Sequence, residues 1–193
     1  MRLFYAVNFN ENVKKVLNES LKEIKKYTVK GSFTDKENFH MTLVFVGECD
    51  SQELPDLKKV ADKTVKKLKL KPIKTAIDRL GTFSRPGDEL LWAGVTTEPK
   101  DILTQMNKVI VEELDEYGLL INDGNKKFKP HITIARKVEF NGITGKEIQQ
   151  MKFVPINFII NSLTLMESTQ GFKTHGYQKY NTIIYKPIYE VKF

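Results

Sequence analysis

The sequence predicts one domain of mixed helices and strands, built from two halves of similar pattern. Three observations support this prediction. Strand-like apolar runs alternate along the 193 residues with apolar stripes of helical period. The order strand, helix, strand, helix, strand then occurs a second time. No Gly/Ser-rich or Pro-rich linker separates the halves, so we expect a single bilobal domain over residues 1–193.

The first half begins with RLFYAVNF, residues 2–9, whose aromatic and aliphatic content predicts a strand. Asn10 is placed to cap a helix, because an apolar stripe of helical spacing runs from Val13 to Ile24. Residues 31–35 read as a loop. A strand containing a histidine then follows from His40 to Gly47.

Similar patterns predict the remaining elements. Pro55 suits the first turn of the second helix, Gly118 suits the end of the third, and Thr144 with Glu147 has the spacing of a capping box. The expected elements are, in order, a helix over residues 57–68, strands over 73–83 and 90–96, a helix over 102–117, a strand from His131, a short helix after Thr144, and strands over 158–166 and 182–193.

The repeat is long. His40 and His131 are 91 residues apart, and LFYAV at Leu3 resembles LWAGV at Leu91, 88 residues later. A separation of this size indicates duplication of a supersecondary unit rather than an array of short repeats. Two halves of this kind pack most simply about a pseudo-two-fold axis, which would bring equivalent residues together at a shared cleft.

Composition narrows the class of protein. A net charge of +7 favours acidic partners such as nucleic acid, although many lysines lie on the polar side of helical stripes, as a solvated face would. The single cysteine, Cys49, excludes an intrachain disulfide. No apolar run is long enough to span a bilayer, and the start of the chain has no signal-peptide pattern, so we expect a soluble, cytoplasmic protein.

Two short strands carry the candidate chemistry. Side chains alternate along a strand, so His40 and Thr42 share one face in HMTL, and His131 and Thr133 share one face in HITI. One such histidine alone is more often a hydrogen-bonded structural residue. Two of the three histidines have a threonine two positions later, and both lie at equivalent points of the repeat. This coincidence indicates a function.

Elimination leaves acid–base chemistry. Metal binding would need three or four converging ligands, and the sequence has one cysteine and neither H-x-H nor H-x-x-x-H. No G-x-S-x-G, P-loop or G-x-G-x-x-G is present. Two imidazoles can serve as proton acceptor and proton donor, while threonine hydroxyls donate to phosphoryl oxygens. A phosphodiester fits that arrangement, with water attacking on one side and an oxygen leaving on the other.

The segments RLFYAV, HMTLVFVGE, FKPHITIAR, LTLMES and GFKTHGY, in this order, are similar to the two-histidine (2H) phosphoesterase superfamily, defined by paired H-x-T-x motifs. Within it the sequence most resembles the RNA 2′,3′-cyclic phosphodiesterases, also called LigT-like proteins or 2′-5′ RNA ligases. The resemblance covers nearly the whole chain. It implies a bilobal α+β fold with two pseudo-two-fold-related antiparallel sheets, outer helices and a central cleft.

The resemblance also implies hydrolysis of a 2′,3′-cyclic phosphate end to a 2′-phosphate, without metal or nucleotide cofactor. His40 would be the proton donor to the departing 3′ oxygen, and His131 the proton acceptor that activates water. Thr42 and Thr133 would hold the phosphate, and Arg136 would contact the phosphate or the terminal base. From the sequence alone the pseudo-symmetry leaves the acid and base roles interchangeable. The expected partners are RNA ends or nucleoside 2′,3′-cyclic phosphates, with no membrane, no metal and a monomeric state.

Two alternatives stay open. The same site could join a cyclic phosphate end to a 5′-hydroxyl as its main role, giving a 2′-5′ linkage, or the protein could be a non-catalytic module that binds single-stranded RNA ends. Three other residues have two interpretations each. His175 is expected in a surface loop, or at the rim of the cleft. Phe9 and Tyr177 could stack a base, or pack as strand-end aromatics. Trp92 is expected in the core.

Overall fold

The computed structural model describes residues 1–85, 88–119, 128–175 and 178–193. Its strands are β1 (Arg2–Asn8), β2 (Thr28–Phe33), β3 (His40–Glu48), β4 (Ile73–Arg85), β5 (Asp88–Glu98), β6 (His131–Phe140), β7 (Ile156–Ile160), β8 (Ser162–His175) and β9 (Gln178–Lys192). Its helices are α1 (Glu11–Ser20), α2 (Lys22–Lys25), α3 (Leu54–Leu68), α4 (Ile102–Glu116) and α5 (Gly145–Gln150), with 3-10 turns η1 (Lys36–Asn38) and η2 (Ser51–Glu53).

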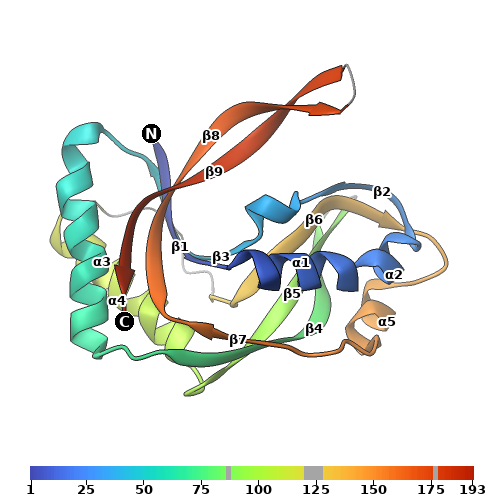
Figure 1. Ribbon diagram of the computed structural model, residues 1–193, viewed down its shortest axis with the longest axis horizontal. Helices are drawn as coiled ribbons and strands as arrows, with labels where there is room; N and C mark the ends of the chain where they lie inside the picture. Colours follow the sequence, from blue (N-terminus) through green and yellow to red (C-terminus); the bar gives the residue numbers. More distant parts are fainter. Residues whose placement is uncertain (86–87, 120–127, 176–177) are drawn as a thin grey trace.

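The strands form two antiparallel sheets. Sheet A has the order β3-β1-β8-β9, and sheet B has the order β2-β6-β5-β4-β7. Helix α3 contacts strands of sheet A, α1 and α5 contact strands of sheet B, and α4 contacts β3 of sheet A and β5 of sheet B. The expected α+β fold with antiparallel sheets and outer helices is therefore confirmed. Strands β8 and β9 continue past the other strands as a long hairpin that projects from the body of the molecule (Figure 1).

Local signals in the sequence set several element ends as expected. The Asn10 side chain accepts a hydrogen bond of 2.9 Å from the Val13 N–H at the start of α1. Thr144 and Glu147 form the predicted capping box of α5. Helix α3 has proline in its first turn, and α4 is followed by Gly118, whose φ of +68° lies in the left-handed region that favours glycine.

Three expectations were wrong. Residues 31–33 belong to β2 instead of a loop, because this edge strand is mostly exposed and is held by backbone pairing with β6 rather than by an apolar pattern. The single strand expected over residues 158–166 is two strands, β7 and β8, which lie in different sheets. Strand β8 then continues to His175, which pairs with Gln178, so His175 ends a strand and does not lie in a loop. The predicted loop over residues 122–127 lies outside the described residues.

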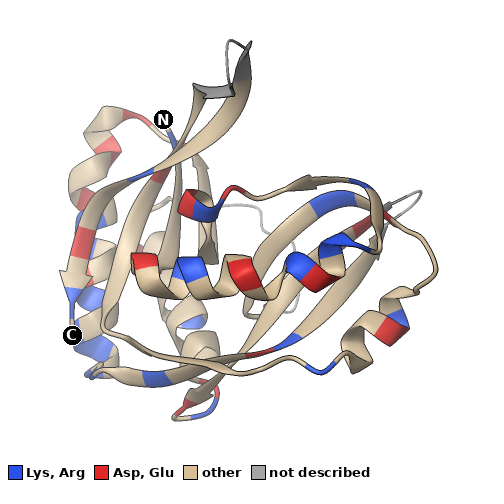
Figure 2. Cartoon of the chain, turned by 45° about the vertical axis from the view of Figure 1, so that its right-hand side comes forward, with Lys and Arg blue, Asp and Glu red and all other residues tan. Residues whose placement is uncertain are grey.

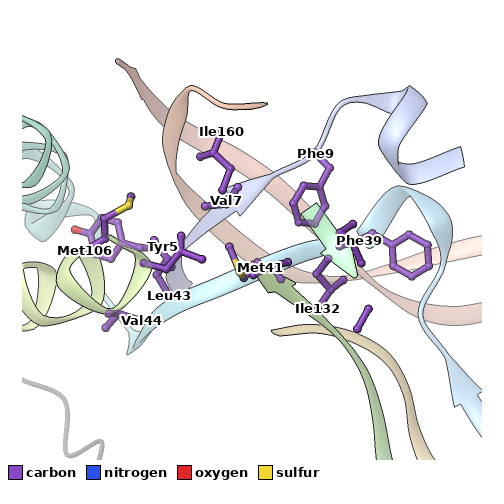
Figure 3. Packing of buried hydrophobic residues seen from close by; sticks show 14 of the residues in the cluster. Tyr5, Val7, Phe9, Phe39, Met41, Leu43, Val44, Met106, Ile132 and Ile160 are labelled. Carbon is purple, nitrogen blue, oxygen red and sulfur yellow. The ribbon is translucent and has the colours of Figure 1, made fainter. Parts of the chain in front are cut away.

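One cluster of buried apolar side chains joins the two sheets. It contains Tyr5 and Met41 from sheet A, Ile132 from sheet B, and Met106 from α4. Figure 3 shows these side chains in one region, with Met41 of β3 between the part that faces α4 and the part near β6. Because β3 and β6 are both anchored in this core, their first residues are held in fixed positions.

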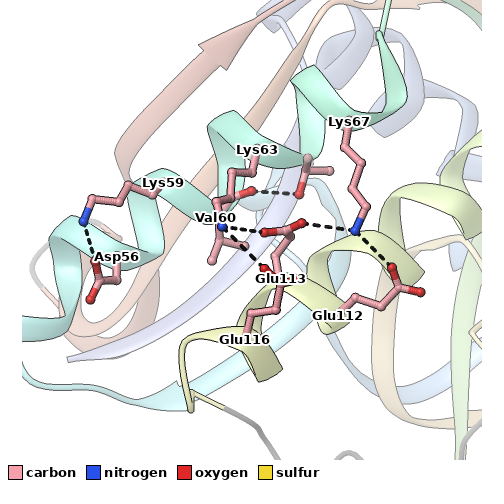
Figure 4. A network of polar contacts seen from close by, with 9 residues as sticks. Asp56, Lys59, Val60, Lys63, Lys67, Glu112, Glu113 and Glu116 are labelled. Atoms are coloured by element: carbon pink, nitrogen blue, oxygen red, sulfur yellow. Dashed lines mark hydrogen bonds and ion pairs between the residues drawn. The ribbon is translucent and has the colours of Figure 1, made fainter.

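A buried carboxylate joins the helices behind sheet A. Glu113 of α4 is 4% exposed, and its oxygens lie 3.2 Å from the Nζ atoms of both Lys63 and Lys67 of α3 (Figure 4). The two ammonium groups outweigh the effect of burial and lower the pKa of Glu113 below its usual range. This junction fixes the helix layer on which β3 rests.

The positive charge is spread over the molecule. Along α1 and α2, Lys residues alternate with Glu residues (Figure 2), as on a solvated helical face. Charge pattern alone therefore does not locate a binding surface. No helix in the described part of the chain is both long and apolar enough to cross a membrane.

Candidate active site

The two histidine strands lie against each other although they belong to different sheets. His40 is the first residue of β3 and His131 is the first residue of β6, and these strands are in contact. His131 is close enough for its charge to lower the pKa of His40. The contact between β3 and β6 therefore brings together the two histidines that are 91 residues apart in the sequence.

Both imidazole rings are anchored in the same way. His40 Nδ1 lies 2.7 Å from the carbonyl oxygen of Asn38, and His131 Nδ1 lies 2.7 Å from the carbonyl oxygen of Lys129. A carbonyl only accepts, so each Nδ1 must carry the proton and donate it. Each Nε2 is then left to take up or release a proton, which is the property a general base or acid requires.

The first threonine of the pair contacts its histidine directly. Thr42 Oγ1 lies 3.1 Å from His40 Nε2, so in the neutral ring this nitrogen accepts from the hydroxyl. His40, Thr42, His131 and Thr133 are all half-buried, as side chains at the edge of a site are. The alternation predicted for the two strands is confirmed, because Met41 and Ile132, the residues between, are fully buried.

Each strand contains a bulge one step past its threonine. In β3, Ala6 pairs with Thr42 but Tyr5 pairs with Val44, which leaves Leu43 as an extra residue. In β6, Trp92 pairs with Thr133 but Leu91 pairs with Ala135. A bulge of one residue reverses the faces of the residues that follow it, up to the next register shift. The side chain three residues past each threonine therefore turns back to the histidine face.

These re-aimed residues are Phe45 in β3 and Arg136 in β6, and both are exposed. The bulge carbonyls have partners of their own. Asn107 Nδ2 of α4 donates to Leu43 O at 2.8 Å, and the Thr34 N–H donates to Ile134 O at 2.8 Å. The bulges are thus built into both halves. The sequence signal was present in the consecutive apolar pairs Leu43–Val44 and Ile134–Ala135, which interrupt strict alternation.

The same pairing corrects the alignment of the halves. Tyr5 and Leu91 occupy equivalent places beside the two bulges, an offset of 86 residues where matching Leu3 with Leu91 predicts 88. A shift of two keeps every side chain on its predicted face, because the strand period is two.

The environment lowers the pKa of both histidines. Burial lowers the pKa of His40 to about 4 and is the largest influence, while the hydrogen bond to the Asn38 carbonyl opposes it. Burial also lowers the pKa of His131, opposed by the Lys129 carbonyl. The positive charge of Arg136 lowers the pKa of both rings. Arg136 is therefore close enough to both histidines for its charge to act on each ring.

Aromatic rings surround the histidines, and sequence reasoning missed most of them. The His40 ring lies 5.0 Å from Phe4 and 4.6 Å from Tyr185 of β9, measured between ring centroids. The His131 ring packs edge-on against Phe83 at 5.2 Å, and Phe83 contacts Trp92. The prediction that Trp92 lies in the core was wrong, because its pairing with Thr133 places it on the histidine face, where it is half-buried.

Other sequence candidates have simpler roles or lie outside the site. Phe9 is 5% exposed and packs edge-on against Phe158, so it is a packing residue. Tyr177 lies outside the described residues. Within the described ranges, no three side chains of His, Cys, Asp or Glu gather in a way that could hold a metal ion.

Comparison with known proteins places this geometry in a family. Residues 15–171 match the model of the 2′-5′ RNA ligase superfamily. The chain belongs to this superfamily. A protein of Thermotoga maritima named RNA 2′,3′-cyclic phosphodiesterase is 29% identical over 195 residues, covering all of this chain and 96% of the relative. A protein of the same name from Thermus thermophilus is 33% identical over 140 residues, covering 71% of this chain and 69% of the relative.

Two solved structures share the fold. A crystal structure of a Thermus thermophilus protein aligns over 100% of this chain and 97% of its own, with a TM-score of 0.71 and 22% identity. The crystal structure of E. coli LigT complexed with 3′-AMP aligns over 99% of this chain and 97% of its own, with a TM-score of 0.71 and 20% identity. The arrangement of two sheets is therefore shared with these solved structures.

Proposed function

We propose that this protein hydrolyses RNA or nucleoside 2′,3′-cyclic phosphate ends to 2′-phosphates by metal-independent acid–base catalysis. One observation carries the proposal: two histidines on adjoining strands are anchored through Nδ1 in the same way, which frees both Nε2 atoms for proton transfer. The names of the relatives support the same substrate class. One bilobal domain over residues 1–193, acting as a cytoplasmic monomer, is part of the proposal.

In the proposed reaction, His131 Nε2 accepts a proton from water as the water oxygen attacks phosphorus. The bond from phosphorus to the 3′ oxygen breaks, and His40 Nε2 gives its proton to that oxygen. The product is a 2′-phosphate with a free 3′-hydroxyl, and proton exchange with solvent resets the two rings. Thr42, Thr133 and Arg136 hold the non-bridging oxygens, where charge builds up in the transition state.

The lowered pKa values constrain the protonation of the site. With both pKa values below 6.5, the rings of the free protein are predominantly neutral at neutral pH. A bound phosphodiester anion favours the charged form of the ring beside it, so substrate binding brings in the proton that His40 later donates. His40, the ring with the strongly lowered pKa, is a strong acid once it is charged. This property supports its role as donor.

The test is direct. Purified protein is incubated with a 2′,3′-cyclic mononucleotide in excess EDTA, and the product is identified by phosphorus NMR. We expect a 2′-monophosphate to form at the same rate with and without chelator. Loss of activity in EDTA that a divalent ion restores would contradict the metal-independent mechanism, and a 3′-monophosphate would contradict the direction of cleavage.

The superfamily name favours a second reaction of the same site. The 5′-hydroxyl of another RNA would attack phosphorus in place of water, and His131 would accept the proton of that hydroxyl. Departure of the 3′ oxygen would then leave the two RNAs joined through a 2′-5′ linkage. Supplying a 5′-hydroxyl oligonucleotide in the same assay tests this reaction. A ligated product that exceeds the hydrolysed one would make ligation the main role.

A further inference from the structure

The histidine face of sheet B continues well beyond the site. Strand pairing places Gly94 of β5 opposite His131, and Arg79 of β4 opposite Gly94. Two residues farther along β5, Thr96 pairs with Ala76. Ala76 in turn pairs with Asn157 of β7, so all these residues share the face of His131. The helices of this lobe pack on the opposite face, since the buried side chains Ile77 and Ala93, the chain neighbours of these residues, point there with the α1 side chains.

Arg79 lies across this face because Gly94 has no side chain. A Cβ atom at position 94 would come within 2.7 Å of Arg79 Nε. The guanidinium is held in place by Asp78 Oδ1 at 2.6 Å, by Thr96 Oγ1 at 3.1 Å and by the Val95 carbonyl at 3.0 Å. The side chain is nevertheless 47% exposed. The result is a fixed, flat, partly open guanidinium on the strand next to Gly94.

Beside Arg79 the sheet is hollowed. A hollow of about 590 Å³, within the rough 300–1,000 Å³ range of small-molecule sites, is lined by residues of β4, β5 and β7. The lining residues that share the His131 face are Lys74, Ala76, Thr96, Glu98, Asn157 and Ile159. Thr96 belongs both to the hollow and to the hydrogen bonds that hold Arg79, so the two features form one surface.

The charges of this surface are balanced. Lys74 lies 3.6 Å from Glu98, and Arg79 is paired with Asp78. A phosphate group would therefore gain little electrostatic stabilisation on this surface. An uncharged planar group fits better, because the guanidinium plane of Arg offers a stacking surface for a base, and Ile159 and Ala76 offer apolar contact. The Asn157 amide can hydrogen-bond to a base edge.

We propose that Arg79 and this hollow form a subsite for the nucleotide upstream of the terminal cyclic phosphate, which makes a single-stranded RNA 3′ end a better substrate than a free cyclic nucleotide. The inference rests on the proposed function. Neighbouring strands lie about 4.8 Å apart, so β7 is roughly 14 Å from β6. A substrate that reaches from His131 to Asn157 therefore carries at least one nucleotide beyond the reacting one.

The experiment compares two substrates. kcat/KM is measured on a 2′,3′-cyclic mononucleotide and on a short oligoribonucleotide that ends in a 2′,3′-cyclic phosphate. Wild type is expected to prefer the oligonucleotide. Arg79→Ala removes the guanidinium, and Ala76→Phe fills the hollow. Each variant should lower kcat/KM on the oligonucleotide about fivefold or more, mainly by raising KM. A loss of about fivefold is the lower end of the effect of one stacked base. Both variants should leave kcat/KM on the 2′,3′-cyclic mononucleotide unchanged.

A matched control removes a positive charge from the other side of sheet B. Lys22→Ala on α2 should leave kcat/KM unchanged on both substrates. The subsite would be overturned if Arg79→Ala and Ala76→Phe lowered kcat/KM equally on both substrates, or if neither variant lowered it on the oligonucleotide. Binding of a fluorescent, uncyclised oligoribonucleotide gives a readout without catalysis, and Arg79→Ala should weaken it. Wild type that binds the oligonucleotide but cleaves neither substrate would overturn the proposed reaction and leave the subsite standing.

Discussion

Strands β3 and β6 have the same construction but different surroundings. Each begins with a histidine anchored to the carbonyl two residues earlier, continues with a threonine on the same face, and bulges one residue later. The bulge then presents Phe45 in β3 and Arg136 in β6. The shared features are those that proton transfer needs. In the proposed mechanism, the differing features decide which ring carries the proton and which side chain lies beside the phosphate.

The difference is larger around the rings than along the strands. The His40 ring contacts both Phe4 and Tyr185, which also contact each other, and Thr42 lies on its Nε2. His131 has one aromatic neighbour among the described ring contacts, Phe83. Burial by these rings accounts for the pKa of about 4 at His40. Neighbours from other strands thus give two similarly built positions different environments, which supports the different roles proposed for the two rings.

The largest expected effect comes from removing either ring. His40→Ala and His131→Ala should each lower kcat roughly 10²–10⁴-fold, the usual range for a positioned acid or base. In wild type, kcat/KM should follow a bell-shaped pH profile with its maximum below pH 6.5, because one ring must be charged and both pKa values are lowered. His131→Ala should remove the limb set by the base, and His40→Ala the limb set by the acid.

The double variant should lose less than the sum of the single losses, since both rings serve one proton-transfer cycle. His175→Ala, in the backbone that ends β8, is the control and should change the rate little. If a folded single variant, judged by circular dichroism and melting, keeps wild-type turnover, the paired mechanism is wrong. The RNA-end binding module would then be the better account.

The threonines come next. Thr42→Ala and Thr133→Ala should each slow turnover by about 2–4 kcal/mol of transition-state stabilisation, the scale for one lost donor to a developing oxyanion. The variants should differ in their pH profiles, because Thr42 also donates to His40 Nε2 and so favours the neutral ring. Thr42→Ala should therefore move the limb set by His40 to higher pH. Steady-state rates across pH check both points, and unchanged rates would leave the threonines as strand residues only.

The strand pattern and the paired motifs could be predicted from the sequence because they depend on local alternation. The histidine surroundings could not. Tyr185 reaches His40 from β9, and Asn38, whose carbonyl anchors His40, is itself held by a 2.7 Å hydrogen bond from its side-chain Nδ2 to Ile183 O, 145 residues away. Such contacts follow from the pairing of β8 with β1, which no local pattern specifies. Trp92 was misplaced for the same reason: its strand pattern is apolar, but its partner is Thr133.

Stability should depend on pH through His40. The folded-state pKa is about 4 and the unfolded value is about 6.5, so the unfolded chain binds the proton more readily between these values. The free energy of unfolding should therefore fall as pH drops from 6.5 to 4, by at most about 3–4 kcal/mol, and level off below. Urea titrations at several pH values measure it. His40→Gln should reduce the slope in this window and leave the part due to His131, whose pKa is also lowered, and an equal slope in the variant would assign the whole effect to other groups.

The smallest expected effect concerns Arg136 and Phe45, the two residues that the bulges return to the histidine face. Arg136→Gln removes the positive charge that lowers the pKa of both histidines. Both limbs of the kcat/KM profile should move to higher pH, by up to about 1 unit, with a lower rate because a phosphate contact is lost. Phe45→Leu, at the equivalent place in β3, carries no charge in either form and should leave both limbs where they are. Limbs that move only in the Phe45 variant would mean that ring packing, and not the Arg136 charge, sets the difference between the two strands.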